Sequence, residues 1–396
     1  MALVVAGLGG TLQGTANLWQ IYELTGSALQ LGLTGLARAI PILAFSLIGG
    51  VIADRIERRK IIMFTQFTAG VFALILGILS VTGLIEVWHI YVLTFISAGV
   101  NSASLPARDA ITANLVPRHH LMNAIGLNTS VNQIARIAGP SIAGLLIAYI
   151  SLPLTYLLTG IAYVLTFLAI TRIYLGPAPA RPRGNPWESL IEGLSFVRAR
   201  PIILTILAID VAMNVFGSYQ ALLPILADRL GTGAAGFGLL SSAPGLGALI
   251  GTAVIVSFGD PRYKGFIMTG AALAFCVWLV GLALSPWFIL SVACTFLLGA
   301  SDAVFTNPRG TLIQLMTPDE LRGRVSSFRT TLTTSSPSLG QSAIGAAATL
   351  LTPPIALIAG AALCATFTIA TFARSAQLRS PELGTHPEVI EPSRPG

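Results

Sequence analysis

Residues 49–60 read GGVIADRIERRK, a short polar stretch between two long apolar runs. Two glycines lead to Asp54, and four of the next six residues are Arg or Lys. Small residues at a helix end let a neighbouring helix approach closely. A carboxylate at such a place can pair with an Arg or lie at the N-terminus of another helix. The stretch therefore predicts a tight turn between two membrane helices, with a plain positively charged anchor loop as the alternative.

The composition of the chain places these helices in a membrane. Hydrophobic residues make up 54%, charged residues only 10%, and mean hydropathy is +0.79. A soluble domain carries about 25% charged residues, so we predict a polytopic membrane protein. The net charge of +7 is spread over short clusters between apolar runs. Such clusters act as orientation signals, and nucleic acid is not an expected partner.

The apolar runs predict an all-α membrane protein with twelve transmembrane helices. A membrane helix needs about 20 mostly apolar residues. The windows that qualify are 2–24, 29–53, 61–83, 89–107, 124–150, 153–173, 202–226, 235–257, 264–284, 286–306, 326–350 and 353–373. The first run begins at Ala2 with no basic lead. Either the first helix is its own insertion signal or a short basic N-terminal segment is missing from the chain, and we expect the second.

An internal duplication divides these helices into two sets. A shift of 201 residues, without a gap, aligns Gly32 with Gly233, Arg108 with Arg309, Pro117 with Pro318, Gly139 with Gly340 and Gly144 with Gly345. Duplication on this scale in an apolar chain is typical of transporters built from two like-oriented bundles. We therefore expect two pseudo-symmetric six-helix bundles around a central cavity.

The expected domains follow from this division. They are an N-terminal six-helix bundle (1–173), a Pro- and Arg-rich cytoplasmic linker that becomes amphipathic and lies along the membrane surface (174–201), a C-terminal six-helix bundle (202–373) and a disordered cytoplasmic tail (374–396). Basic residues follow the even-numbered spans, and the other loops hold only Arg229. By the positive-inside rule, both termini and the linker are cytoplasmic.

The pattern Gly50-x-x-x-Asp54-Arg55-x-x-Arg58-Arg59 resembles the signature of the major facilitator superfamily between its second and third helices, with Glu57 in place of a common Gly. A bacterial exporter subgroup with enterobactin exporters and macrolide-efflux permeases is similar over essentially the whole chain. The segments that carry this similarity are 23–27, 37–41, 49–55, 106–117 and 311–325. The resemblance implies the major facilitator fold in a bacterial cytoplasmic (inner) membrane.

The resemblance also implies a cytoplasmic gate motif made of Gly50, Asp54, Arg55, Arg58 and Arg59. In the family, the aspartate closes the cytoplasmic side by docking on the start of the eleventh helix. Here that start is 324–327, with Ser326 or Ser327 as the cap. Release of this latch would be one half of alternating access, with spans 1, 4, 7 and 10 lining the cavity.

Span 5 carries a second motif. Ala135, Gly139 and Ala143 are four residues apart, which creates a small-residue face for tight packing. Pro140 removes a backbone donor and bends the helix. With Gly144, this helix 5 motif resembles the antiporter motif of exporters, in which glycines stand at the two alanine positions. Ordinary packing of small residues is the alternative.

Polar residues within the spans are candidates for substrate binding or proton coupling. Each Asp or Arg at mid-depth costs about 2.5–3.5 kcal/mol, so it faces a cavity or a partner. These residues are Gln13, Asn17, Gln20, Arg38, Arg136, Asp210, Asn214 and Asp302. Asp210 is the first candidate, with a static ion pair to Arg38 or Arg136 as the alternative. Asp302 lies low in span 10, where hydrated pairing is expected. Cations in the first half and carboxylates in the second suggest charge pairs across the cavity.

No pattern in the chain predicts an enzyme. We find no hydrolase triad, paired-carboxylate site or phosphate-binding Walker loop. Residues 231–236 match G-x-G-x-x-G but lie between two membrane spans. His119 and His120 are adjacent and have no third metal ligand nearby. We therefore expect no cofactor, no metal and no ATP-driven pumping.

The predicted function is secondary active transport. We expect an exporter of a small amphiphilic or anionic compound, such as a drug or siderophore, that works by alternating access as a proton-coupled antiporter. An importer or lysolipid flippase on the same scaffold is the alternative, and a membrane enzyme or sensor is a remote one. The expected partners are the substrate, membrane lipid and protons, and we expect a monomer.

Overall fold

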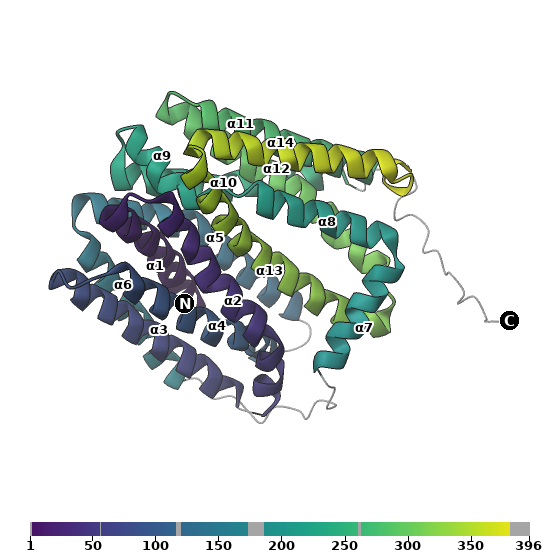
Figure 1. The fold of residues 1–396 in the computed structure, drawn as a ribbon. Coiled ribbons are helices and arrows are strands. Elements are labelled where there is room, and N and C mark those ends of the chain that lie inside the picture. Colours follow the sequence, from purple (N-terminus) through teal and green to yellow (C-terminus); the bar gives the residue numbers. More distant parts are fainter. Residues whose placement is uncertain (1, 56, 116–119, 173–185, 260–262, 381–396) are drawn as a thin grey trace.

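The computed structural model describes residues 2–55, 57–115, 120–172, 186–259 and 263–380. Within these ranges it leaves out the side chains of residues 2–4, 6, 46–55, 58, 103, 105–115, 121, 124–125 and 186–190. All regular secondary structure in this part of the chain is helical. Figure 1 shows the helices in two groups that lie side by side.

The first half holds α1 (Ala2–Thr25), α2 (Ala28–Arg55), α3 (Arg58–Val81), α4 (Val87–Leu115), α5 (Leu121–Tyr149) and α6 (Leu152–Thr171). The second half holds α8 (Pro201–Phe216), the 3-10 helix η2 (Gln220–Leu222), α9 (Leu223–Arg229), α10 (Gly233–Ser257), α11 (Lys264–Leu284), α12 (Phe288–Leu315), α13 (Asp319–Leu350) and α14 (Pro353–Arg374). All twelve predicted windows are confirmed as helix, although the seventh is broken between α8 and α9.

Nine stretches of the described helices are long and apolar enough to cross a membrane, with α8 through α9 counted as one. Large apolar side chains stay exposed along them, among them Phe64, Leu165 and Ile289. Exposed apolar surface on this scale suits lipid rather than water. Among the other long helices, α13 is the most polar, because it carries charged residues and a run of Ser and Thr residues.

The helices α12 and α13 extend beyond their predicted windows. The polar run after residue 306 made the end of α12 read as a loop, but the helix continues to Leu315. Asp302 therefore lies in mid-helix rather than near an end. Helix α13 begins at Asp319, with Pro318 at the N-cap position and no side-chain cap. The prediction that Ser326 or Ser327 caps this helix was wrong, because both lie two turns inside it.

The helix α7 (Pro186–Ala199) belongs to the predicted linker and packs on the second half. A Cβ on Gly193 would come within 2.8 Å of the Arg324 carbonyl oxygen of α13. Glu192 of α7 also pairs with the Arg324 guanidinium. After α14, the 3-10 helix η3 (Gln377–Arg379) packs Leu378 against Gly265. The disorder predicted from residue 374 therefore does not apply to η3, and residues 381–396 lie outside the described residues.

The two halves meet where α2 crosses α13 and α5 crosses α10. The contacts lie near the turns α1–α2, α5–α6, α9–α10 and α13–α14, an end that we call the closed end. A Cβ on Gly32 would come within 2.8 Å of the Cα of Gly345. A Cβ on Gly144 would come within 2.7 Å of the Cα of Gly238. The glycines thus allow backbone contact at both crossings.

These crossings correct the gap-free alignment of the two halves. Gly144 and Gly345 take equivalent places 201 residues apart, as predicted. Their partners Gly32 and Gly238 also take equivalent places but are 206 residues apart. The second half has five extra residues before α10 and five fewer between the starts of α11 and α12. The two offsets cancel, so a single shift of 201 still matches both ends of the repeat.

Candidate functional site

A polar cavity of about 340 Å³ opens within the first half. It is lined by residues of α1, α2, α4 and α6, and by Thr334 of α13 from the second half. Its main polar side chains are Gln13, Asn17, Arg38, Thr94, Ser97 and Asn101. The structure thus brings together three of the predicted candidates, from α1 and α2.

Arg38 supplies the positive charge of this cavity. Its guanidinium lies against Gly14 of α1, where an added Cβ would stand 3.1 Å from Nη2. No carboxylate in the described part of the chain pairs with it. A charge inside a membrane protein that has no counter-ion among the described residues favours an anionic ligand.

Two buried polar atoms at the cavity are unpartnered. Asn17 is 6% exposed and donates through Nδ2 to Thr94 Oγ1 at 3.2 Å. Its Oδ1 atom and the Ser97 Oγ atom have no hydrogen-bond partner. A buried polar atom left without a partner costs about 1–3 kcal/mol. A ligand or water that bonds to these atoms would recover that cost.

Gln20 does not line the cavity, although the sequence places it on the same face as Gln13 and Asn17. It is buried and accepts a hydrogen bond from Ser80 Oγ of α3 at 3.1 Å. Gln20 lies one turn nearer to the closed end, where α3 is its neighbour. Its role in the structure is therefore a contact between two helices.

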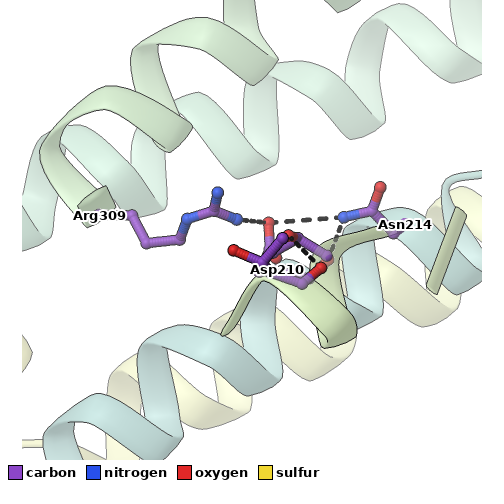
Figure 2. A network of polar contacts seen from close by, with 5 residues as sticks. Asp210, Asn214 and Arg309 are labelled. Carbon is purple, nitrogen blue, oxygen red and sulfur yellow. Dashed lines mark hydrogen bonds and ion pairs between the residues drawn. The ribbon is translucent and has the colours of Figure 1, made fainter. Parts of the chain in front are cut away.

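The second half contains a buried ion pair between Asp210 of α8 and Arg309 of α12. Asn214 donates through Nδ2 to the Asp210 carbonyl oxygen at 2.8 Å and lies 3.5 Å from its Oδ1 atom. Figure 2 shows Asp210 between Arg309 and Asn214. A static ion pair was the alternative prediction for Asp210, but with Arg38 or Arg136. The partner is instead Arg309, so the expected pairing of Asp210 across the halves was wrong.

Sequence reasoning missed Arg309 because its predicted span ended at residue 306. The one signal that could have found it was the match of Arg108 with Arg309 in the repeat. The Arg108 side chain lies outside the described residues. Arg309 is 6% exposed. Its Nε atom and the Oδ2 atom of Asp210 are buried and have no hydrogen-bond partner.

A second group of charges lies around this pair. Asp302 is exposed and lies within electrostatic range of Arg309 and of Arg136 from α5. Arg136 and Asp302, which belong to opposite halves, therefore influence each other electrostatically, and no ion pair between them is formed among the described residues. Arg329 of α13, also missed from sequence, lies within range of Asp210 and Arg309.

The gate motif lies largely outside the described side chains, including those of Gly50, Asp54, Arg55 and Arg58. Arg59 is described and donates to the carbonyl oxygens of Ile170, at 3.3 Å, and Thr171. These are among the last carbonyls of α6, where a cation is favoured by the helix dipole. Arg59 thus ties α3 to α6 within the first half.

The helix 5 motif packs in two directions. A Cβ on Gly139 would overlap Thr11 of α1, and Thr11 Oγ1 donates to the Ala135 carbonyl oxygen at 3.0 Å. Pro140 and Gly144 instead face Gly238 of α10 in the other half. The predicted tight packing is present, inside the half at Gly139 and between the halves at Gly144.

The described residues hold no group of three or more His, Cys, Asp or Glu side chains placed to bind a metal. A family model described as "Transmembrane secretion effector", of the major facilitator type, matches residues 1–389. The chain belongs to this transporter family. As a major facilitator protein it is a multi-pass membrane transporter of small molecules, and its family and fold are not those of enzymes.

Curated relatives of this family member are exporters. The chain is 29% identical over 342 residues to the enterobactin exporter EntS of Shigella boydii, with 86% of this chain and 82% of that protein covered. It is 28% identical, with the same coverage, to the enterobactin exporter EntS of Escherichia coli strain SMS-3-5.

Solved structures of other transporters share the fold. The nucleoside transporter NupG superposes on this major facilitator protein with a TM-score of 0.74 at 11% identity, covering 94% of this chain and 97% of that one. A bacterial homologue of the lysosomal transporter Spinster, inward-facing and occupied, gives 0.73 at 12% identity, covering 96% and 97%. At these identities the likeness shows the fold alone.

Proposed function

We propose that the protein exports a small anionic or amphiphilic compound by alternating access. The observation that carries this proposal is Arg38, a cation without a carboxylate partner among the described residues, in a cavity with unpartnered polar atoms. The similarity to enterobactin exporters supports outward transport. The cavity of about 340 Å³ is large enough for part of a drug-sized ligand.

The direction of opening supports loading from the cytoplasm. The positive-inside rule orients the even-numbered loops, and with them both termini, toward the cytoplasm. The closed end then faces outward, and we propose that the cavity of the first half loads from the cell interior. Transport would require the halves to rock about their glycine crossings, so that the Asp54 turn meets α13 and the closed end separates.

The Asp210–Arg309 pair is our candidate for proton coupling. Protonation of Asp210 removes its attraction to Arg309, and the freed guanidinium could then interact with Asp302 or with an anionic substrate. A buried carboxylate in a membrane interior is the kind of group that proton-coupled transporters use. We therefore propose an inner-membrane proton antiporter, and a monomer because one chain supplies both halves of the transporter.

The test is transport by the protein in cells and in vesicles. In a bacterial strain that lacks its own efflux pumps, expression is expected to lower the accumulation of at least one compound from a panel of antibiotics and siderophores. Arg38→Gln should abolish this effect, whereas Gln20→Ala, one turn outside the cavity, should keep most of it. Higher accumulation on expression would instead favour an importer. Movement of a labelled lysolipid between leaflets of proteoliposomes would favour a flippase.

A further inference from the structure

A second cavity, of about 370 Å³, lies between α12 and α13 at the end of the molecule opposite the closed end. The two helices diverge from the turn at residues 316–318, and the cavity fills the space between them. Its lining residues are Ile313, Gln314, Thr317, Arg322, Gly323, Val325, Ser326 and Arg329. None of these residues belongs to the cavity of the first half.

The charge of this cavity is positive. Arg329 is half-buried and reaches from α13 to α12, where its Nη1 atom would lie 3.5 Å from a Cβ on Gly310. Arg329 is repelled by the charge of Arg309 and attracted by the charge of Asp210. Because Asp210 already pairs with Arg309, one carboxylate serves two guanidinium groups. No carboxylate of the described residues lies within ion-pair distance of Arg329.

Arg322 adds a second donor at the mouth of the cavity. It pairs with Asp319 at 2.6 Å, but the two side chains are 54% and 77% exposed. An ion pair this exposed is worth roughly 1 kcal/mol or less, so Arg322 can turn to a ligand at little cost. Gln314 of α12 and Ser326 of α13 line the cavity as further donors, whereas the Thr317 hydroxyl already donates to the Ile313 carbonyl oxygen at 2.6 Å.

We propose that this cavity binds a phosphate-type anion between Arg322 and Arg329. Arginine forms paired, charge-assisted hydrogen bonds with phosphate oxygens, and the two guanidinium groups approach the same space from one helix face, seven residues apart. The buried side chains of Ile313 and Val325 supply the apolar part of the lining. A bound anion would neutralise Arg329 and leave Asp210 to Arg309 alone.

The experiment measures thermal unfolding of the purified full chain in a neutral detergent. Inorganic phosphate replaces chloride at constant ionic strength. Wild-type protein is expected to show a saturable rise in unfolding midpoint, and Arg329→Gln should weaken the apparent affinity about 10-fold or more. Arg324→Gln is the matched control, since Arg324 lies on the same helix but pairs with Glu192 outside the cavity. An equal loss in both variants would overturn the proposal.

A second variant tests the site without substituting Arg329, so that a loss of stability caused by removing this side chain does not affect the result. A Cβ on Gly323 meets no atom within 4 Å, so a side chain is accommodated there. Gly323→Glu should abolish the phosphate response by placing a carboxylate in the cavity, whereas Gly323→Ala should retain it. A full response in Gly323→Glu would contradict the site.

The lipid composition of nanodiscs distinguishes a soluble phosphate anion from a lipid headgroup as the ligand. Stabilisation of wild type by free phosphate indicates a soluble anion. Stabilisation only in nanodiscs of phosphatidylglycerol, and not of phosphatidylcholine, indicates a lipid headgroup, provided that Arg329→Gln removes it. If neither phosphate nor phosphatidylglycerol separates wild type from Arg329→Gln, the cavity is not an anion site.

Discussion

Asp210 of α8 and Arg309 of α12 form an ion pair within the second half, with side chains 3% and 7% exposed. Burial of a charged pair costs desolvation that the attraction between the charges only partly offsets. Such a pair is therefore weak evidence for a stabilising role, and a pair that can be opened is useful in a transporter. The first two predictions separate these roles.

Removal of one charge of the pair should destabilise the protein more than removal of both. Asp210→Asn alone leaves the buried Arg309 charge uncompensated, and Arg309→Gln alone leaves the buried Asp210 charge uncompensated. Each is expected to lower the free energy of unfolding by up to about 3–5 kcal/mol. The double variant should recover at least half of that loss. A double-mutant cycle of unfolding midpoints in detergent measures the coupling. Strictly additive losses would mean that the two groups do not interact.

Asp210 should also determine how transport depends on pH. We expect wild-type transport into inverted vesicles to follow the pH gradient, and Asp210→Asn to flatten the pH profile because its side chain cannot ionise. Asn214→Ala is the control, since it removes a neighbour of Asp210 but no titratable group. An unchanged pH profile in Asp210→Asn would assign the pair a structural role.

Substitutions of Gln13 and Gln20, two glutamines of the same helix, should affect transport differently because Gln13 alone lines the cavity of the first half. Gln13→Ala and Arg38→Gln are expected to raise the apparent KM for an anionic substrate, about 10-fold or more for Arg38 because a charge-assisted hydrogen bond is worth about 1.5–3 kcal/mol. Gln20→Ala should change KM little, since Gln20 bonds to Ser80. Equal effects at Gln13 and Gln20 would place the substrate elsewhere.

The glycine crossings should tolerate no side chain. Gly238→Leu would bring its Cβ within 2.6 Å of the Pro140 carbonyl oxygen, so the closed end should be held apart and transport lost. Gly270→Leu on α11 is the matched control, because a Cβ there meets no atom within 4 Å. Distances between spin labels at Thr25 and Asp228 would report the separation. Wild-type transport by Gly238→Leu would show that the crossing need not close.

The latch implied by the turn between α2 and α3 predicts a separate phenotype. Asp54→Asn keeps the size of the side chain and removes its charge, so membrane levels should stay near normal while transport falls. Quantitative immunoblots of membranes, combined with uptake into inverted vesicles, make this comparison. Undiminished transport by Asp54→Asn would rule out the latch.

The fold could be predicted largely from sequence because lipid-facing helices need long apolar runs, and these runs stand out. The failures occurred where a helix carries polar residues. The predicted span ended at residue 306 because Asn307 and Arg309 are polar. In the structure, Asp210 forms an ion pair with Arg309 inside the bundle. Helix windows contain no information about partners on other helices, so the pair of Asp210 with Arg309 was out of reach.

The candidate site was predicted in part. Gln13, Asn17 and Arg38 line one cavity, whereas spans 7 and 10, which were also expected to line it, contribute no residue. The role of these side chains in binding stays a prediction. The helix face predicted from Gln13 and Asn17 included Gln20, which the structure separates because α3 approaches α1 near the closed end. Residues on one face of a helix point in the same direction, but they contact different neighbouring helices at different positions along its length.

The two glycine crossings are one contact made twice. Gly32 meets Gly345 in one and Gly144 meets Gly238 in the other, and each pairs the second helix of one half with the fifth helix of the other. The same surface patch on both partners is the hallmark of an isologous dimer, which a two-fold axis relates. A six-helix ancestor would thus have needed only one self-complementary patch to assemble in pairs. Gene fusion could then join the pair while leaving each copy free to diverge, one toward Arg38 and the other toward Asp210.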